Sequence, residues 1–132
     1  EDDLAELERF LIGARLDAVG VFGYSDEDGT DAASFEGKHD AEVIAARVSR
    51  VAALADELVA QRAEDRVGEP VRVLVESVGP DGVVGRAEHQ GPDVDGSTTL
   101  VGATAGIAVG EFVSAVVIDS DGADLTATVA AA

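Results

Sequence analysis

Cysteine is absent from this sequence, and aromatic residues are scarce. The 132 residues include no cysteine, which excludes disulfides, thiolate metal sites and cysteine nucleophiles. Aromatic residues make up 4% of the chain and hydrophobic residues 46%. Burial must therefore come mainly from Val, Leu, Ile and Ala, each of which buries less area than an aromatic ring. The length suits one ordinary domain or two small ones, and we expect a globular chain with a modest core.

Long hydrophobic runs are also missing. No stretch approaches the roughly 20 apolar residues of a membrane span, and no charged segment followed by an apolar one opens the chain. We therefore expect a soluble chain with no membrane partner. The sequence begins at Glu1 without a methionine, within what looks like the first turn of a helix, so we interpret it as a fragment of a longer protein.

Histidine is rare, and the acidic turns lack the spacing of a metal site. His39 and His89 are the only histidines, and neither has a second ligand close by, which argues against zinc binding and histidine-based catalysis. Three turns resemble calcium loops, at residues 26–29, 93–96 and 119–122. Each lacks the ligands that an EF-hand places before and after its glycine. The sequence thus predicts no metal ligand and no catalytic residue.

Basic residues are few, and charge is the most informative part of the composition. The 9 lysines and arginines face 27 acidic residues, which gives a net charge of -18 and a pI near 4.1. Residues 68–132 contain two arginines, no lysine and ten acidic residues, a net charge of -8. Such a field repels phosphate backbones and attracts basic partners. The charge therefore disfavours nucleic acid and favours a basic protein, although the alternative is a surface that only confers solubility or salt tolerance.

The first half of the chain carries helical and buried-strand patterns. Apolar residues recur at helical spacing from Asp2 to about Ala14, which predicts an amphipathic helix. Residues 16–24 form a near-continuous apolar run of the kind found in buried parallel strands. A polar loop follows to Asp40, which can cap a second helix that we expect from about residue 41 to 66. Helix, buried strand and helix together indicate an α/β arrangement.

The pattern changes class at Pro70, which cannot continue a helix. Beyond it the spacing predicts strands at about residues 71–78, 83–90, 97–101, 111–119 and 124–129. Turn residues at 80–82 and 119–122 separate neighbouring strands, and residues 102–110 form a pliable loop. Five short antiparallel strands with glycine-rich turns indicate a small closed barrel of the OB type.

Two stretches resemble a known family. GRAEHQGPDVDGSTTL, at residues 85–100, resembles the TRAM domain that closes the radical-SAM methylthiotransferases, and the phrase PDVDG resembles the RimO-type branch, which modifies a ribosomal protein. The first part of the chain is similar to the end of the radical-SAM barrel. The matching residues there are Asp3, Leu4, Glu6, Leu7, Phe10, Arg15, Leu16, Asp17, Val19, Gly20, Phe22, Tyr24, Ser25, Glu27, Gly29, Thr30 and Ala32. Glu27 favours the RimO type because the tRNA-modifying MiaB type has arginine there, whereas Asp31 departs from the family by replacing a proline.

The resemblance implies a fold and an activity for the parent protein. Residues 1–67 would be a helix–strand–helix remnant of the radical-SAM α/β barrel, and residues 68–132 the TRAM domain, giving an α+β chain with a five-stranded antiparallel OB-like barrel. The parent would be a cytoplasmic enzyme that attaches a methylthio group to an aspartate of small-subunit ribosomal protein twelve. It would use S-adenosylmethionine and two [4Fe-4S] clusters. The cluster ligands are cysteines before Glu1, so the fragment alone would be non-catalytic and bind neither cofactor.

The resemblance also suggests roles for named residues. Phe22 and Tyr24 would lie at the carboxyl end of a barrel strand, beside the adenosyl group, although Phe22 could simply pack within the barrel. Glu88, Asp93 and Asp95 are candidate substrate-docking residues, since carboxylates on a solvated loop are available to lysine or arginine. Two other functions stay open. The barrel could be an RNA-binding TRAM module of the MiaB type, which calls for a basic face, or a purely structural cap.

Overall fold

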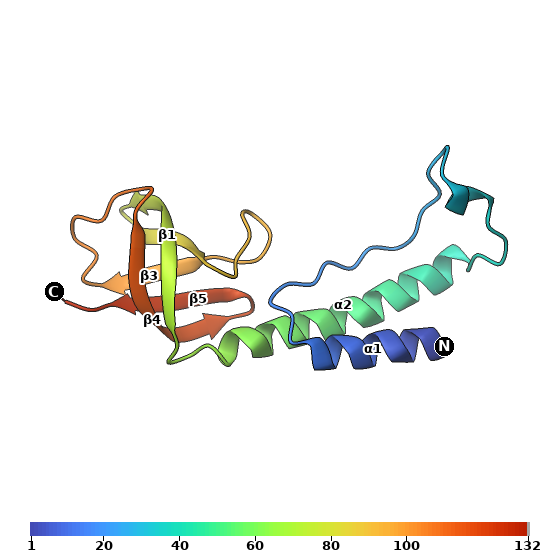
Figure 1. Cartoon of the computed structure of the whole chain (residues 1–132), viewed down its shortest axis with the longest axis horizontal. Helices are drawn as coiled ribbons and strands as arrows, with labels where there is room; N and C mark the ends of the chain where they lie inside the picture. The colour runs from blue at the N-terminus through green and yellow to red at the C-terminus, as the bar shows by residue number, and fades with distance from the viewer. Residues whose placement is uncertain (132) are drawn as a thin grey trace.

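The computed structural model describes residues 1–131 and shows two helices side by side, followed by a β-barrel (Figure 1). Helix α1 spans Asp2–Ala14, as predicted, with Asp2 and Asp3 in its first turn at the positive end of the helix dipole. Leu11 is its buried residue, and Arg15 ends the helix in the left-handed conformation. An ion pair between Glu8 and Arg50 joins α1 to the second helix. The helical part thus has both apolar and ionic contacts.

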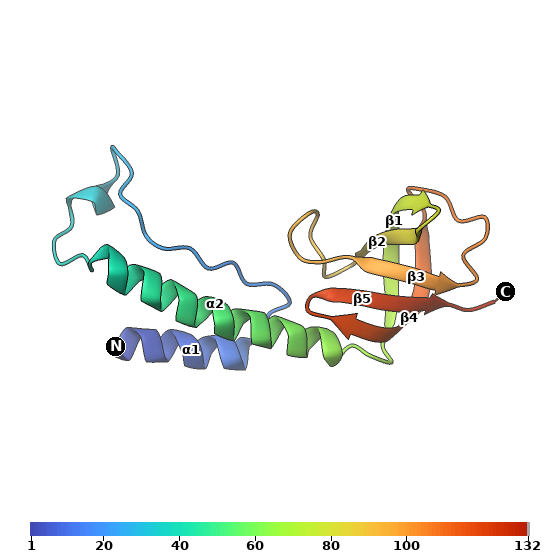
Figure 2. The same ribbon diagram turned by 180° about the vertical axis from the view of Figure 1, so that it is seen from behind.

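The predicted strand at residues 16–24 is wrong, because this segment forms no strand. It runs alongside the second helix instead (Figures 1 and 2), where Gly23 lies against Ile44 and Val48. A buried parallel strand needs hydrogen-bonding neighbours in a sheet. None of the strands in residues 1–131 lies beside this segment. The apolar run therefore packs on a helix, and a single turn of 3-10 helix at Asp31–Ser34 follows it.

Helix α2 spans Ala41–Glu64 and links the helical part to the barrel. Asp40 occupies the N-cap position as predicted, although its side chain makes no capping hydrogen bond. The helix ends two residues earlier than expected, and Gly68, with φ of 91°, turns the chain toward the first strand. The amide of Gly68 donates to the carbonyl of Val117 at 2.8 Å, so the connection is itself hydrogen-bonded to the barrel.

Five strands close into a barrel, as predicted. They are β1 (Pro70–Gly79), β2 (Gly82–Ala87), β3 (Thr98–Gly102), β4 (Phe112–Asp121) and β5 (Asp124–Val129), in the order β1-β2-β3-β5-β4 around the ring. One pair, β3 with β5, is parallel, so the prediction of purely antiparallel pairing is wrong at that seam. The reason is geometric: strand direction can alternate around a closed ring only when the number of strands is even.

The barrel interior is filled by aliphatic side chains, which agrees with the expected modest core. The buried cluster consists of Val73, Val75, Val83, Leu100, Ala115 and Ala127. A second cluster joins Ala63 of α2 to Val117 and Leu125, so the last turns of the helix cover part of the barrel. Within residues 1–131, no helix is both long and apolar enough to cross a membrane.

Two of the three predicted connections differ from the prediction in detail. The turn at residues 80–82 lies between β1 and β2 as predicted. The later turn falls at residues 122–123 instead of 119–122, because a register shift between Val117 and Asp119 lets β4 continue to Asp121. The loop at residues 103–111 is anchored, since Ile107 packs against the core and the amide of Gly110 donates to the carbonyl of Val75.

Candidate docking surface at the helix–barrel junction

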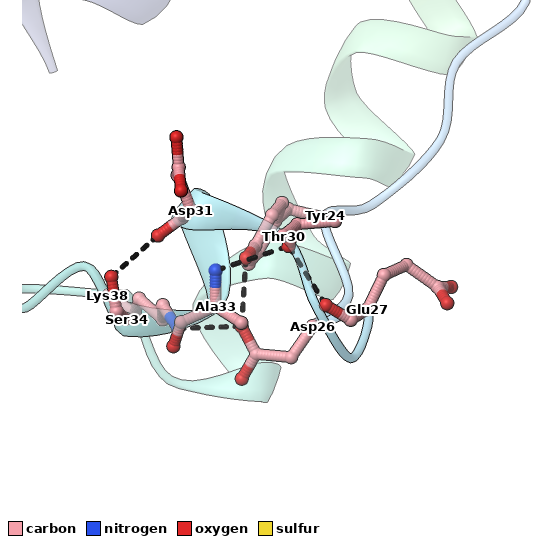
Figure 3. A network of polar contacts seen from close by, with 8 residues as sticks. All are labelled: Tyr24, Asp26, Glu27, Thr30, Asp31, Ala33, Ser34 and Lys38. Carbon is pink, nitrogen blue, oxygen red and sulfur yellow. Dashed lines mark hydrogen bonds and ion pairs between the residues drawn. The ribbon is translucent and has the colours of Figure 1, made fainter.

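The residues proposed to lie beside a cofactor are on the segment before α2, where Gly23 between them packs against Ile44 and Val48. Phe22 is 91% exposed. The hydroxyl of Tyr24 donates to Asp26 at 2.8 Å, and the ammonium of Lys38 donates to the same carboxylate oxygen at 2.6 Å (Figure 3). The hydrogen bond to Asp26 raises the pKa of Tyr24, and the one from Lys38 chiefly lowers the pKa of Asp26. Tyr24 is thus engaged within its own loop, and the cofactor role of both aromatic residues stays a prediction.

The three candidate docking residues lie on the connection between β2 and β3, but they differ in availability. Glu88 and Asp93 are exposed, and Asp93 holds a positive φ of 65°. Asp95 accepts a hydrogen bond from the amide of Gly91 at 2.9 Å, which closes the loop on itself. Figures 1 and 2 show this connection projecting from the barrel toward the helical part. Two of the three carboxylates are therefore presented to solvent, while the third helps to shape the loop.

Gln90, which the sequence reasoning missed, anchors this loop from inside. Its side chain is only 4% exposed. The amide oxygen accepts from the Ala87 amide at 2.9 Å and the Thr98 hydroxyl at 2.6 Å, and the amide nitrogen donates to the carbonyls of Ser97 and Ala123, both at 3.1 Å. A buried amide with every partner satisfied holds the backbone around it in one arrangement. No local pattern marks Gln90, because its partners Ser97 and Thr98 lie seven and eight residues away and its partner Ala123 lies 33 residues away.

A charged cluster joins three segments beneath the loop. The carboxylate of Asp17 lies 2.6 Å from Arg66 and 3.1 Å from Arg62, both on or just after α2. Burial opposes ionisation of Asp17, but the hydrogen bond from Arg66 and the charges of both arginines outweigh it, so the pKa of Asp17 is lowered. His89 is half-buried beside them, and burial followed by the charge of Arg66 lowers its pKa. Asp17 and His89 line the same small hollow, which places the barrel loop against the helical part.

An acidic groove runs between α2 and the β4–β5 hairpin. Its volume is about 640 Å³. Its carboxylates belong to Glu57, Glu64, Asp119 and Asp121. The spacing of seven places the two glutamates two turns apart on one face of α2, and the exposed side chains of Val67 and Ile118 add apolar surface. No lysine or arginine lines the groove, and none of the four carboxylates forms an ion pair among the described residues.

The acidic groove was not predicted from the sequence. Its lining comes from two elements that are more than fifty residues apart, so spacing alone does not bring its carboxylates together. What it can do follows from its charge: it attracts cations and basic side chains, and its apolar surface can contact their aliphatic stems. The junction therefore offers a surface suited to a basic polypeptide.

Comparison with known proteins finds a family match for the barrel and relatives of nearly the whole chain. Residues 67–130 match the TRAM domain family. Over 95% of its length the chain is similar, with 66% identity, to ribosomal protein uS12 methylthiotransferase RimO from Saccharopolyspora erythraea. The proteins of the same name from Streptomyces avermitilis and Cutibacterium acnes are 61% and 54% identical over 96% and 95% of the chain. The chain covers 26% of each relative, so it spans about a quarter of their length.

Proposed function

This chain belongs to the RimO-type methylthiotransferase family and carries a TRAM domain, and we propose that it is the substrate-docking part of such an enzyme. The whole enzyme would methylthiolate an aspartate of small-subunit ribosomal protein twelve, uS12. It would act in the cytoplasm, where it meets its ribosomal substrate. In this proposal the chain itself binds the protein substrate and performs no chemistry.

The acidic groove between α2 and the β4–β5 hairpin is the observation that carries this proposal. A protein that binds ribosomal RNA must present positive charge to phosphates. Four carboxylates without ionic partners, in a molecule of net charge -18, complement such a protein. Electrostatic complementarity of this kind steers encounter and orients the partner. The exposed carboxylates of Glu88 and Asp93 would add a second point of contact on the barrel loop.

The residues present do not fit the iron–sulfur clusters that the family implies. Iron–sulfur clusters of this type are held by cysteine thiolates, and the sequence has no cysteine. Within residues 1–131, no group of three histidine or acidic side chains comes together as a metal site. We therefore assign the ligands of both clusters to parts of the enzyme outside this chain, and Phe22 and Tyr24 remain our proposed contacts of the adenosyl group in the whole enzyme.

The proposal is tested by titrating this chain with purified uS12 and with tRNA. We expect uS12 to bind at about 0.15 M salt and tRNA not to bind. Glu57→Gln combined with Glu64→Gln should weaken uS12 binding by up to about thirtyfold, since exposed charge pairs contribute about 0 to 1 kcal/mol each. The matched control is Asp56→Asn with Asp81→Asn, which removes two exposed charges outside the groove and should change binding by less than about twofold.

The barrel loop is tested in parallel with Asp93→Asn combined with Asp95→Asn, for which we expect a loss of at most about tenfold. Binding of tRNA at physiological salt would identify an RNA-binding TRAM module instead. Failure of uS12 to bind would leave the chain as a structural cap of the catalytic domain.

A further inference from the structure

The outer face of β1, β2 and β4 carries a row of side chains unlike the rest of this acidic surface. Alternation along the strands turns Arg72 and Leu74 of β1 outward, because their neighbours Val73 and Val75 fill the core. Leu74 is paired in register with Arg86 on one side and with Phe112 on the other. Both arginines of residues 68–132 therefore lie on one face, next to an exposed aromatic ring.

Arg72 is held in place but has no ionic partner. Its guanidinium lies 4.1 Å from the centroid of the Phe112 ring, a cation–π contact that limits the motion of both side chains. Seven of the nine basic residues form ion pairs with carboxylates, while Arg9 and Arg72 do not, among the residues described. By contrast, Arg86 is paired with Glu76 at 2.7 Å. Stacking leaves the N–H edge of the Arg72 guanidinium free to donate.

Arg72 also lies where a ligand could reach it. It lines a hollow of about 470 Å³ together with Arg66, His89 and the hydroxyl-bearing Ser114, which is its register partner on β4. It also lines an adjoining hollow of about 180 Å³ with Arg86 and Phe112. The larger hollow and the acidic groove flank the connection between α2 and β1, since residue 66 lines one and Val67 the other. A polypeptide that crosses this connection would contact both.

The chemistry of this position suits one carboxylate. A planar guanidinium fork matches a carboxylate with two parallel hydrogen bonds, and preorganisation on a ring reduces the entropy lost when they form. An RNA strand would instead bring a phosphate at every nucleotide across a surface of net charge -18, and Glu88 lines both hollows. A single acidic side chain meets that repulsion at one point only, where it is opposed by the unpaired Arg72. The hydroxyl of Ser114 can donate a further hydrogen bond to its carboxylate.

We propose that Arg72, stacked on Phe112, is a specificity-determining residue that receives an aspartate or glutamate side chain of the docked protein partner. This inference rests on the proposed function. The acidic groove would attract any basic protein, whereas a single positive site on an acidic surface accepts only a partner with an acidic residue at the matching place. Arg72 therefore determines how the partner is positioned on this surface. A partner with a basic residue at the matching place is rejected, because like charges would face each other.

The test measures binding of uS12 to the chain and to its variants at about 0.15 M salt. Arg72→Gln should weaken binding by roughly tenfold, the loss expected for one charge-assisted bidentate pair. Arg72→Lys should recover only part of this, because lysine keeps the charge but lacks the fork. Phe112→Leu should weaken binding by severalfold, because it removes the ring on which the Arg72 guanidinium stacks. Arg9→Gln, the matched control, removes the other basic residue without an ion pair and should leave affinity unchanged.

A charge-swap experiment identifies the partner residue. Arg72→Glu should lower affinity further than Arg72→Gln, and one acidic-to-lysine substitution in uS12 should restore it. Unchanged binding by Arg72→Gln, with binding still weakened by the groove variant, would overturn this inference and leave the proposed function standing. If the unmodified chain does not bind uS12, both fail. If an RNA oligonucleotide binds and Arg72→Gln abolishes that binding, the face recognises nucleic acid and the inference is wrong.

Discussion

The carboxylate of Asp17 forms ion pairs with two arginines, whose positive charges would otherwise repel each other. Arg62 lies in the last turn of α2 and Arg66 in the turn that follows it, and both reach the same carboxylate. Asp17 comes from a segment with no regular structure and lies 2.6 Å from Arg66. The side chain of Asp17 is only 33% exposed, so this pair is screened less than a surface pair. It secures the segment after α1 to the end of α2 next to the barrel.

Asp17→Asn should therefore reduce the free energy of unfolding by about 1 kcal/mol at pH 7, a value discounted for partial exposure. The pKa of Asp17 is lowered from its ordinary value of 3.8. Its stabilisation is thus fully present above pH 3.8 and is lost as the pH falls through the lowered pKa. Thermal unfolding of both proteins between pH 7 and 2 should show the difference shrink only below about pH 4. Asp28→Asn, an exposed control, should show no such difference. A stability difference between Asp17→Asn and the unmodified chain that persists at pH 2 would contradict a role for the ionised carboxylate.

At the scale of elements, α2 belongs to both parts of the molecule. Its first turns lie alongside the segment at residues 15–30. Near its end, Ala63 is buried against Val117 and Leu125 of the barrel. The boundary predicted between residues 67 and 68 stays a prediction. The packing of Ala63 nevertheless means that the end of α2 contributes to the stability of the barrel. The same contact positions the glutamates of α2 beside the β4–β5 hairpin, which forms the acidic groove.

Ala63→Asp should lower the free energy of unfolding of the barrel by about 2 to 4 kcal/mol, because it places a carboxylate among apolar side chains. Ala46→Asp makes the same change at an exposed position of α2. It should cost no more than about 0.7 kcal/mol, the difference in helix propensity. Chemical denaturation, monitored by hydrogen exchange of the barrel amides, distinguishes the effects of the two substitutions. Equal effects of both substitutions would show that α2 and the barrel are energetically independent.

At the scale of the whole molecule, charge opposes folding and favours association. A net charge of -18 on 132 residues makes the compact state repel itself. The ion pairs described are mostly at least partly exposed, so each contributes little against that repulsion. In the proposed function, the same field would draw the basic partner toward the junction. Salt therefore acts on stability and on binding in opposite directions.

Raising sodium chloride from about 0.05 to 0.5 M shortens the Debye length from roughly 14 to 4 Å. We expect the thermal midpoint to rise by several degrees, because like charges are screened, and the association rate with uS12 to fall. Calorimetry and stopped-flow mixing on the same samples measure the two effects. A midpoint that falls with salt would show that ion pairs, not repulsion, dominate the stability of this chain.

The sequence determined the elements and their class. Helical spacing placed α1 at its observed bounds and α2 within two residues of its observed end. Alternation and turn residues located all five strands, since side-chain direction along a strand depends only on local geometry. The excess of acidic residues likewise followed from composition. The resemblance of residues 85–100 to TRAM domains agrees with the family match over residues 67–130.

The tertiary structure decided which residues become neighbours in space. Residues 16–24 have the composition of a buried strand, but a strand exists only where another strand can bond to it. The parallel seam between β3 and β5 follows from closing five strands into a ring. The acidic groove, the hydrogen bond from Gln90 to Ala123 and the stacking of Arg72 on Phe112 join residues more than thirty apart. Local pattern carries no information about such neighbours, because their proximity depends on how the whole chain packs.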